Sequence, residues 1–194
     1  MKSTRSVYEL LSIVENIEGW LSNYEQFALL HLPSMVDHIP GDIVEIGSYK
    51  GKSTIALALG SSLLSTRKRP IYAIDPFVNP YVSFYDPYFD SFWANVKYHG
   101  LENFVIPIKK FSTQAYGDCP KSIAAIFIDG DHEYSSVKHD IISYTPRVLK
   151  EGLIVFHDYS DQYPGVLKAV DELCDNEGFK PIIIYDNLIL VRKL

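Results

Sequence analysis

The chain of 194 residues is predicted to be one α/β domain with a Rossmann-like, doubly wound seven-stranded sheet. Short runs rich in valine and isoleucine alternate with segments of helical periodicity, which is typical of a mostly parallel sheet covered by helices on both faces. Two apolar runs close the chain with only a tight turn between them. This predicts a C-terminal hairpin that contributes one antiparallel strand. The length fits a single domain with a full core.

Residues 1–40 are predicted to form helices that precede the first strand. Apolar residues recur at helical spacing over residues 7–19. Ser22 and Glu25 have the spacing of a capping box, in which a serine caps the helix and a glutamate three positions later bonds back to it. A second helix is therefore expected to begin there and to end before Pro40 in "IPGD".

From residue 42 onward, strands and helices are predicted to alternate. The predicted strands cover residues 42–47, 70–75, 104–108, 124–129, 152–158, 180–186 and 187–194, and the predicted helices cover 52–64, 90–100, 135–149 and 165–177. In such sheets the ligand crevice lies beyond the carboxyl ends of the parallel strands. Four of the five parallel strands end in an acid: Glu45, Asp75, Asp129 and Asp158. Acids at this edge favour a ligand with hydroxyls, amines or a bound cation over a bare triphosphate.

Composition and charge argue against several functional classes. The net charge of -6 and the pI near 5.5 are unlike those of nucleic-acid binders, which present a basic face. No apolar run approaches the ~20 residues of a membrane span, and the N-terminus lacks a secretory leader. Cys119 and Cys174 lack metal-ligand spacing, so both are expected to be reduced thiols. We expect a cytoplasmic protein that binds neither nucleic acid nor membranes.

The glycine turn after the first strand, "EIGSYKGKST", is close to two nucleotide-binding motifs and matches neither. A phosphate-binding P-loop needs four residues between Gly47 and the Gly51-Lys52-Ser53 triplet, and only three are present. Glu45 would also place negative charge beside the phosphates. The dinucleotide fingerprint has a second glycine where this chain has Tyr49. A P-loop-like ATP-binding protein, with "AAIFIDGD" supplying a magnesium ligand, remains an alternative.

The same turn resembles the first motif of class I S-adenosylmethionine-dependent methyltransferases, in which an acid and one further residue precede G-x-x-x-G, as in "EIGSYKG". Further along, "IDGDHEY", followed by "VFHDY", resembles a subgroup of small-molecule and sugar O-methyltransferases with an IDGDHxY signature. The resemblance extends from about Gly19 to the end of the chain. It implies S-adenosylmethionine-dependent O-methylation of a small hydroxylated acceptor, such as a sugar or a secondary metabolite.

The resemblance also implies which residues bind the cofactor. They are Glu45, Ile46, Gly47, Ser48, Tyr49, Gly51, Ser53, Thr54, Asp75, Pro76, Phe77, Phe111, Ser112, Asp129 and Gly130. The backbone amides at the helix start, with the Ser53 hydroxyl, are expected to meet the carboxylate of the methionine portion. Asp75 is expected to accept from the ribose hydroxyls, and Phe77 to pack near the adenine.

Two catalytic arrangements are open, and they draw on Asp129, His132, His157 and Asp158. In the first, Asp129, His157 and Asp158 hold Mg²⁺ or Mn²⁺, which lowers the pKa of the acceptor hydroxyl. The metal-dependent O-methyltransferases that the chain resembles carry an acid where His157 stands. Because magnesium prefers oxygen ligands, this departure argues against a hard cation. In the second, His132 or His157 is a general base without a metal.

The aromatic segment at residues 75–93 combines prolines with many rings between the second strand and its helix. It is predicted to be a lid-like loop that stacks on the small-molecule acceptor, and the alternatives are a cover over the core or a homodimer contact. A further alternative for the whole chain is a non-catalytic binding protein on the methyltransferase fold.

Overall fold

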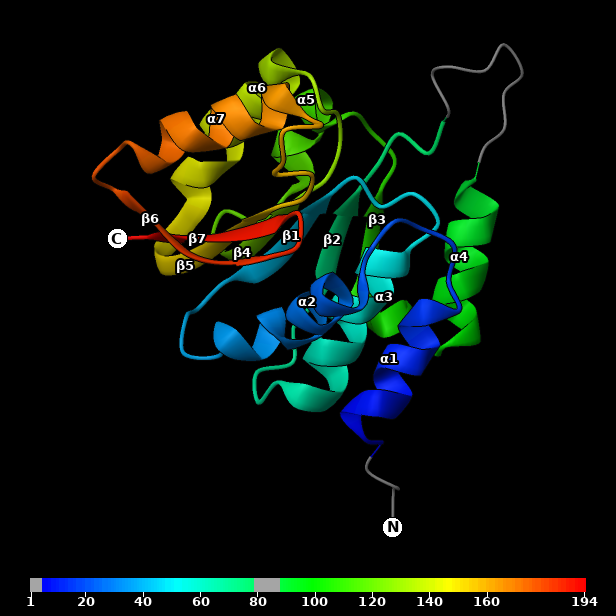
Figure 1. Ribbon diagram of the computed structural model, residues 1–194. Coiled ribbons are helices and arrows are strands. Elements are labelled where there is room, and N and C mark those ends of the chain that lie inside the picture. Colours follow the sequence, from blue (N-terminus) through cyan, green and yellow to red (C-terminus); the bar gives the residue numbers. More distant parts are fainter. Residues whose placement is uncertain (1–4, 79–87) are drawn as a thin grey trace.

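The computed structural model describes residues 5–78 and 88–194, and it has a seven-stranded sheet between two layers of helices (Figure 1). The strands are β1 (Asp42–Ile46), β2 (Ile71–Ile74), β3 (Val105–Ile108), β4 (Ile123–Ile128), β5 (Val148–Phe156), β6 (Phe179–Tyr185) and β7 (Leu188–Lys193). The α-helices are α1 (Val7–Glu15), α2 (Asn23–Met35), α3 (Lys52–Leu59), α4 (Phe89–Tyr98), α5 (Ser112–Ala115), α6 (Tyr134–Tyr144) and α7 (Pro164–Cys174).

The strand order is β3-β2-β1-β4-β5-β7-β6, which confirms the predicted doubly wound sheet. β1 pairs in parallel with both β2 and β4, so the chain reverses its direction of winding at β1. β7 lies antiparallel to β5 and to β6, as the predicted hairpin requires. Of the helices described, none is long and apolar enough to cross a membrane.

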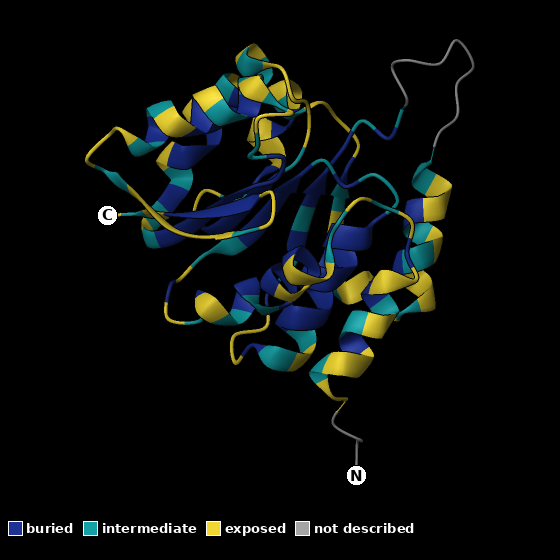
Figure 2. Ribbon diagram, in the orientation of Figure 1, coloured by how far each residue is buried: buried dark blue, intermediate teal, exposed yellow. Residues whose placement is uncertain are grey.

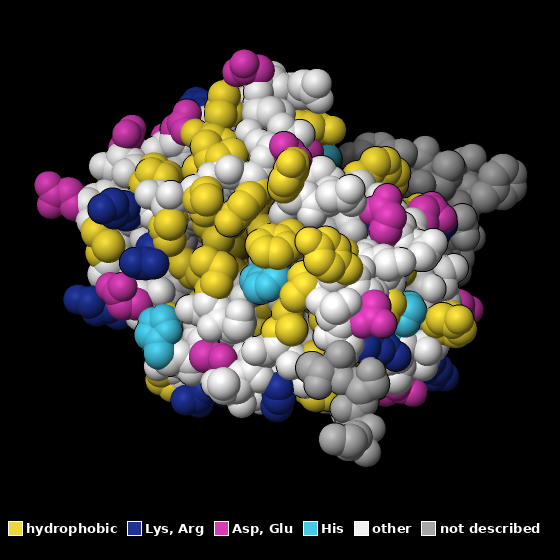
Figure 3. Space-filling view, turned by 60° about the horizontal axis from the view of Figure 1, so that its bottom comes forward, with side chains coloured by type: hydrophobic (Ala, Val, Ile, Leu, Met, Phe, Trp, Pro, Cys, Tyr) yellow, Lys and Arg dark blue, Asp and Glu magenta, His cyan; other side chains and the backbone are white. Residues whose placement is uncertain are grey.

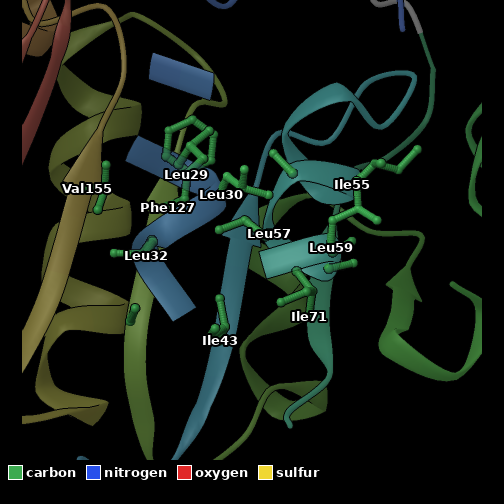
Figure 4. Close-up of a cluster of buried hydrophobic side chains, with 14 of the residues drawn as sticks. Leu29, Leu30, Leu32, Ile43, Ile55, Leu57, Leu59, Ile71, Phe127 and Val155 are labelled. Carbon is green, nitrogen blue, oxygen red and sulfur yellow. The ribbon is translucent and has the colours of Figure 1, made fainter. Parts of the chain in front are cut away.

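The core has one apolar cluster on each face of the sheet, because side chains alternate between the faces along every strand. Ile43 of β1 belongs to the cluster under α1, α2, α3 and α4, and its neighbour Val44 belongs to the cluster under α6 and α7. Figure 4 shows leucines of α2 and α3 meeting Ile43 and Ile71 in the first cluster. Apart from the edge strand β6, the sheet is accordingly the most deeply buried layer (Figure 2).

Some large apolar side chains remain on the surface. Tyr24, Phe27 and Met35 of α2 are at least 40% exposed, and so are the isoleucines of 182–184 in the edge strand β6. Figure 3 shows hydrophobic side chains gathered on one face of the molecule. The central part of the segment 75–93, for which a lid or a homodimer contact was predicted, lies outside the described residues, since residues 79–87 are not described. Residues 89–93 at its end belong to α4.

A close contact between α2 and the end of α3 fixes these two helices against each other. Gly60 begins a π-helical turn (Gly60–Leu64) directly after α3. A Cβ atom at Gly60 would lie 2.0 Å from the backbone oxygen of Leu30 in α2. Gly60 itself has ordinary helical dihedrals, so glycine is required there by space and not by backbone conformation.

We expect Gly60→Ala to lower the free energy of unfolding by about 1–3 kcal/mol, the usual cost of overpacking a core. Helix propensity alone predicts the opposite sign, because alanine is favoured over glycine in helices by about 1 kcal/mol. Urea denaturation followed by circular dichroism measures the change. Gly117→Ala is the control, since nothing lies within 4 Å of a Cβ there. A Gly60→Ala variant as stable as the wild type would contradict the close packing.

Candidate functional site

The carboxyl ends of β1, β2, β3, β4 and β5 surround a cavity of about 710 Å³, a size typical of small-molecule sites. Most of the predicted cofactor residues line it: Ile46, Gly47, Ser48, Tyr49, Ser53, Asp75, Pro76, Phe111, Ser112, Asp129 and Gly130. The four predicted catalytic residues, Asp129, His132, His157 and Asp158, line it as well. The sequence therefore placed the cavity at the correct edge of the sheet.

The glycine loop between β1 and α3 lies against the ends of the two neighbouring strands. The Gly47 amide donates to the Ile74 oxygen of β2 at 2.9 Å, and the Asp129 amide after β4 donates to the Ile46 oxygen at 2.8 Å. Gly47 has φ +87°, and a Cβ there would lie 1.9 Å from the Asp129 backbone oxygen. Only glycine satisfies both the backbone conformation and this contact.

Asp75 fastens the loop to the end of β2. Its Oδ2 accepts from the backbone amides of Ser48 at 2.9 Å and Tyr49 at 2.8 Å. Its Oδ1 accepts from the Phe77 amide at 2.6 Å and from the Tyr88 hydroxyl at 3.0 Å. The Tyr88 hydroxyl thus makes the kind of bond to Asp75 that was predicted for a ribose hydroxyl.

Glu45 and Thr54 were predicted to bind the cofactor, but neither lines the cavity. They support the glycine loop from the protein interior. Glu45 is fully buried, and its Oε2 accepts from the Ser48 hydroxyl at 2.7 Å and from the Thr54 hydroxyl. Within the described part of the chain, its Oε1 has no partner. Burial raises the pKa of Glu45 to about 7, although the hydroxyl donors act in the opposite direction.

Phe77 and Gly51 were also predicted to bind the cofactor, and neither lines the cavity. The Phe77 ring packs on the rings of Phe89 and Phe92, with centroids 5.0 and 4.8 Å away. A Cβ at Gly51 would lie 3.1 Å from the Phe92 ring, so this glycine makes room for α4. The prediction that Phe77 packs on the cofactor is not supported, because its ring belongs to the core. Val78, the next residue, lines the cavity instead.

His157 lies among three carboxylates at the end of β5. Its Nδ1 is 3.2 Å from both Asp129 Oδ1 and Asp158 Oδ2, and its Nε2 is 3.3 Å from Glu25 Oε2. Burial alone would lower the pKa of His157, but the hydrogen bonds to these acids raise it to about 12. A protonated imidazole that donates from both nitrogens has no lone pair for a metal or a substrate proton. This geometry does not support His157 as metal ligand or general base.

Glu25 was predicted only as a helix cap, and the structure gives it a second role. The capping box is present, with the Ser22 amide donating to Glu25 Oε2 at 2.8 Å. The same carboxylate contacts His157 and accepts from the Asn187 amide in the β6–β7 turn at 3.0 Å. Glu25 therefore joins α2, β5 and the C-terminal hairpin at the site. Only the tertiary fold brings these segments together, so no local sequence pattern could predict this role of Glu25.

His132 lies at the open side of the cavity. Its Nε2 is 2.8 Å from Asp158 Oδ2, and its ring is 4.5 Å from the Tyr163 ring. The hydrogen bond to Asp158 raises the pKa of His132. The side chain is 44% exposed, so a ligand can approach it.

One set of side chains among those described has the spacing of a metal site. Ligand atoms of Asp129, His132 and Asp158 all lie within 4.8 Å of one another. The set shares two members with the predicted one and replaces His157 by His132. Two carboxylates and a neutral imidazole suit Mn²⁺, Fe²⁺ or Zn²⁺ better than Mg²⁺. The donors present thus fit a divalent cation of intermediate softness.

The segment between α1 and α2, which was not predicted to contribute, also forms part of the cavity wall. Glu18 accepts from Lys50 Nζ and from the Tyr49 hydroxyl, each at 2.7 Å, and this ties the segment to the glycine loop. Trp20 packs on Tyr49 with ring centroids 5.1 Å apart, and it lines the cavity while 75% exposed. Tyr163, beside His132, contributes a further aromatic ring to the lining.

Comparison with known proteins gives one family and one fold. Residues 44–159 match the family model described as "Methyltransferase domain". The uncharacterized protein R132 of Acanthamoeba polyphaga mimivirus is 28% identical over 168 residues, which are 83% of this chain and 72% of that protein.

Two solved structures share the fold at low sequence identity. The O-methyltransferase NovP superimposes with a TM-score of 0.74 at 18% identity, over 89% of this chain and 80% of that chain. An O-methyltransferase from Bacillus cereus in complex with SAH gives 0.73 at 16% identity, over 100% and 94% of the two chains. The predicted fold class is thereby confirmed.

The buried carboxyl group of Glu45 predicts a specific pH dependence of stability. Its pKa in the folded state lies above the ordinary 4.5, so its contribution is complete below pH 4.5 and decreases as the pH rises toward 7. Relative to Glu45→Gln, the unfolding free energy of the wild type should fall by up to about 1.4 kcal/mol per pH unit in that window. Urea denaturation of both proteins from pH 4.5 to 8 measures the difference. A difference that does not change with pH would show that Glu45 is ionised throughout.

Proposed function

The chain belongs to the methyltransferase domain family, and on that premise we propose that it transfers a methyl group from S-adenosylmethionine to a hydroxyl group of a small hydroxylated acceptor, such as a sugar or a secondary metabolite. The observation that carries the proposal is the division of the cavity. One part is bounded by the glycine loop and Asp75. The other is open and contains the His132–Asp158 pair, with the Tyr163 ring beside His132. Asp129 lies between the two parts.

The closed part suits the cofactor. The backbone at Gly47 carries no side chain that would obstruct a ligand, and Ser53 at the start of α3 lines the cavity where a carboxylate would meet the helix N-terminus. Asp75 accepts a hydrogen bond from the Tyr88 hydroxyl, and a ribose hydroxyl would replace that donor when the cofactor binds. Asp129 supplies negative charge for the amine and the sulfonium. The Bacillus cereus protein, which shares the fold, was solved with SAH.

His132 is our candidate for the general base. In the reaction an acceptor oxygen attacks the methyl carbon, the carbon–sulfur bond breaks, and S-adenosylhomocysteine leaves as a neutral thioether. The acceptor hydroxyl loses its proton, and His132 takes it. With Nε2 directed at Asp158, Nδ1 is the nitrogen that accepts the proton, and the carboxylate stabilises the imidazolium that forms.

Asp129, His132 and Asp158 would together hold a divalent metal, which would supply a lowered pKa for the acceptor hydroxyl when bound. A neutral imidazole has a single lone pair, so His132 cannot both bind a metal and accept the proton of the acceptor. The two catalytic arrangements therefore compete for the same residue. In either one, His157 remains the cation that offsets the charge of the surrounding acids.

The ATP-binding alternative conflicts with the hydrogen bonding of the loop. A P-loop directs its backbone amides at the phosphates. Here the amides of Ser48 and Tyr49 donate to Asp75, so they are not available to a phosphate, and the carboxylate would repel one.

We expect isothermal titration calorimetry to show micromolar binding of S-adenosylmethionine and S-adenosylhomocysteine, and no binding of ATP with magnesium. Asp75→Asn should weaken both affinities at least about tenfold, because a charge-assisted bond to ribose is lost. Glu151→Gln is the control, a surface carboxylate of β5 that does not line the cavity. Binding of ATP alone, abolished by Lys52→Ala, would overturn the proposal.

The pH profile of methyl transfer tests the base. A base acts when unprotonated, so kcat/KM should rise with pH through the pKa of His132, which Asp158 holds above its ordinary 6.5. Asp158→Asn should move the rising limb to lower pH, and His132→Gln should lower kcat at least about a hundredfold without changing cofactor affinity. The acceptor would come from a screen of sugars and phenols. Activity that EDTA abolishes and manganese restores would favour the metal arrangement instead.

A further inference from the structure

The carboxylate of Asp75 has a full set of hydrogen-bond donors within the protein. A carboxylate can accept about four hydrogen bonds, two at each oxygen. Its Oδ2 accepts from the Ser48 amide at 2.9 Å and from the Tyr49 amide at 2.8 Å. Its Oδ1 accepts from the Phe77 amide at 2.6 Å and from the Tyr88 hydroxyl at 3.0 Å. Asp75 lines the cavity with only 5% of its surface exposed, so a ribose hydroxyl can bond to it only after one of these donors has left.

Tyr88 is the donor among these that a ligand can displace. The others are backbone amides, which the glycine loop and the turn after β2 hold in place. Tyr88 bonds through its side chain, which directly precedes α4, is only partly buried and lines the cavity. Its hydroxyl also lies 3.4 Å from the backbone oxygen of Val78, a second acceptor within reach. A hydroxyl donates one proton, so Tyr88 can transfer its bond from Asp75 to Val78 and remain paired.

The surroundings of Tyr88 keep its hydroxyl protonated and directed at Asp75. Its ring packs on the rings of Tyr49 and Phe77, with centroids 4.9 and 6.0 Å away. Burial and the charge of Asp75 raise the pKa of Tyr88, so the phenol remains a donor through the neutral pH range. A desolvated carboxylate oxygen without a donor is costly, and Tyr88 supplies that donor when no ligand is bound. A ligand that displaces Tyr88 has to bring a donor of its own.

We propose that Tyr88 is an internal competitor of the cofactor, whose hydroxyl occupies the Asp75 oxygen that a ribose hydroxyl takes in the complex. This inference rests on the proposed function. Each bond from the ribose to Asp75 replaces a bond that the protein already makes, so only the difference between the two contributes to affinity. A nucleoside that lacks ribose hydroxyls leaves Tyr88 on Asp75 and makes no such exchange. Tyr88 thus lowers the affinity only for ligands that carry ribose hydroxyls, which favours release of the product.

The test measures by calorimetry how S-adenosylhomocysteine and its 2′,3′-dideoxy analogue bind to the wild type and to Tyr88→Phe. We expect Tyr88→Phe to bind S-adenosylhomocysteine at least about threefold more tightly, because the ribose hydroxyl then meets an Asp75 oxygen that has lost its donor. Its affinity for the dideoxy analogue should not rise, since that ligand brings no hydroxyl. Tyr98→Phe is the control, because Tyr98 at the other end of α4 is 85% exposed and lies outside the cavity lining. It should bind both compounds as the wild type does.

Each outcome bears on one proposal. If the wild type binds neither compound, the proposed function fails. If it binds S-adenosylhomocysteine and Tyr88→Phe binds it no more tightly, or binds both compounds more tightly to the same extent, the role of Tyr88 fails and the proposed function stands.

Should Tyr88→Phe not fold, as its thermal unfolding curve will show, the wild type decides the matter. Its tyrosine absorption should shift to shorter wavelength when S-adenosylhomocysteine binds, because a phenol loses its bond to a carboxylate, and the dideoxy analogue should cause no such shift. Equal spectra with the two compounds would overturn the role of Tyr88.

Discussion

The close approach of Gly47 to the ends of β2 and β4 is the contact on which the site depends. The loop after β1 bonds to β2 through the Gly47 amide and to β4 through the Ile46 oxygen, and no side chain fits between Gly47 and Asp129. Asp75 and Glu45 then accept from the loop on either side of its backbone. The loop is therefore shaped before a ligand arrives, and Asp129 is held beside it. A ligand meets preorganised groups, which lowers the entropic cost of binding.

Charge balance around His157 is the second constraint. Asp129, Asp158 and Glu25 would repel one another in a partly buried place, and the imidazolium between them offsets that repulsion. The positive charge among these three acids thus comes from a side chain of the protein itself. The same arrangement makes the N-terminal helix α2 and the C-terminal hairpin part of the site, because Glu25 contacts both His157 and Asn187.

The sequence predicted what depends on local pattern. The carboxyl ends of the parallel strands, the glycine turn and the capping box at Ser22 are set by short-range chemistry, and the structure has them. The predicted helix 135–149 was too long, because α6 ends at Tyr144 and β5 begins at Val148. Prediction failed where a contact joins distant segments. Phe77 was expected on the cofactor, but α4 covers its ring. Trp20 belongs to the cavity wall because it packs on Tyr49 and its neighbour Glu18 accepts from the glycine loop. Asp140 also lines the cavity, and its burial follows from the sequence because it lies among apolar residues at helical spacing in "VKHDIISY".

The charge of the cavity wall bears on the direction of the proposed reaction. Its acids are Glu18, Asp75, Asp129, Asp131, Asp140 and Asp158, and its lysines are Lys52 and Lys110. Such a wall attracts a ligand with a sulfonium and an ammonium group more than one with several phosphates. Methyl transfer removes the sulfonium charge, so the attraction to Asp129 weakens once the product has formed. The electrostatics that favour binding of the methyl donor thus also favour release of its neutral thioether.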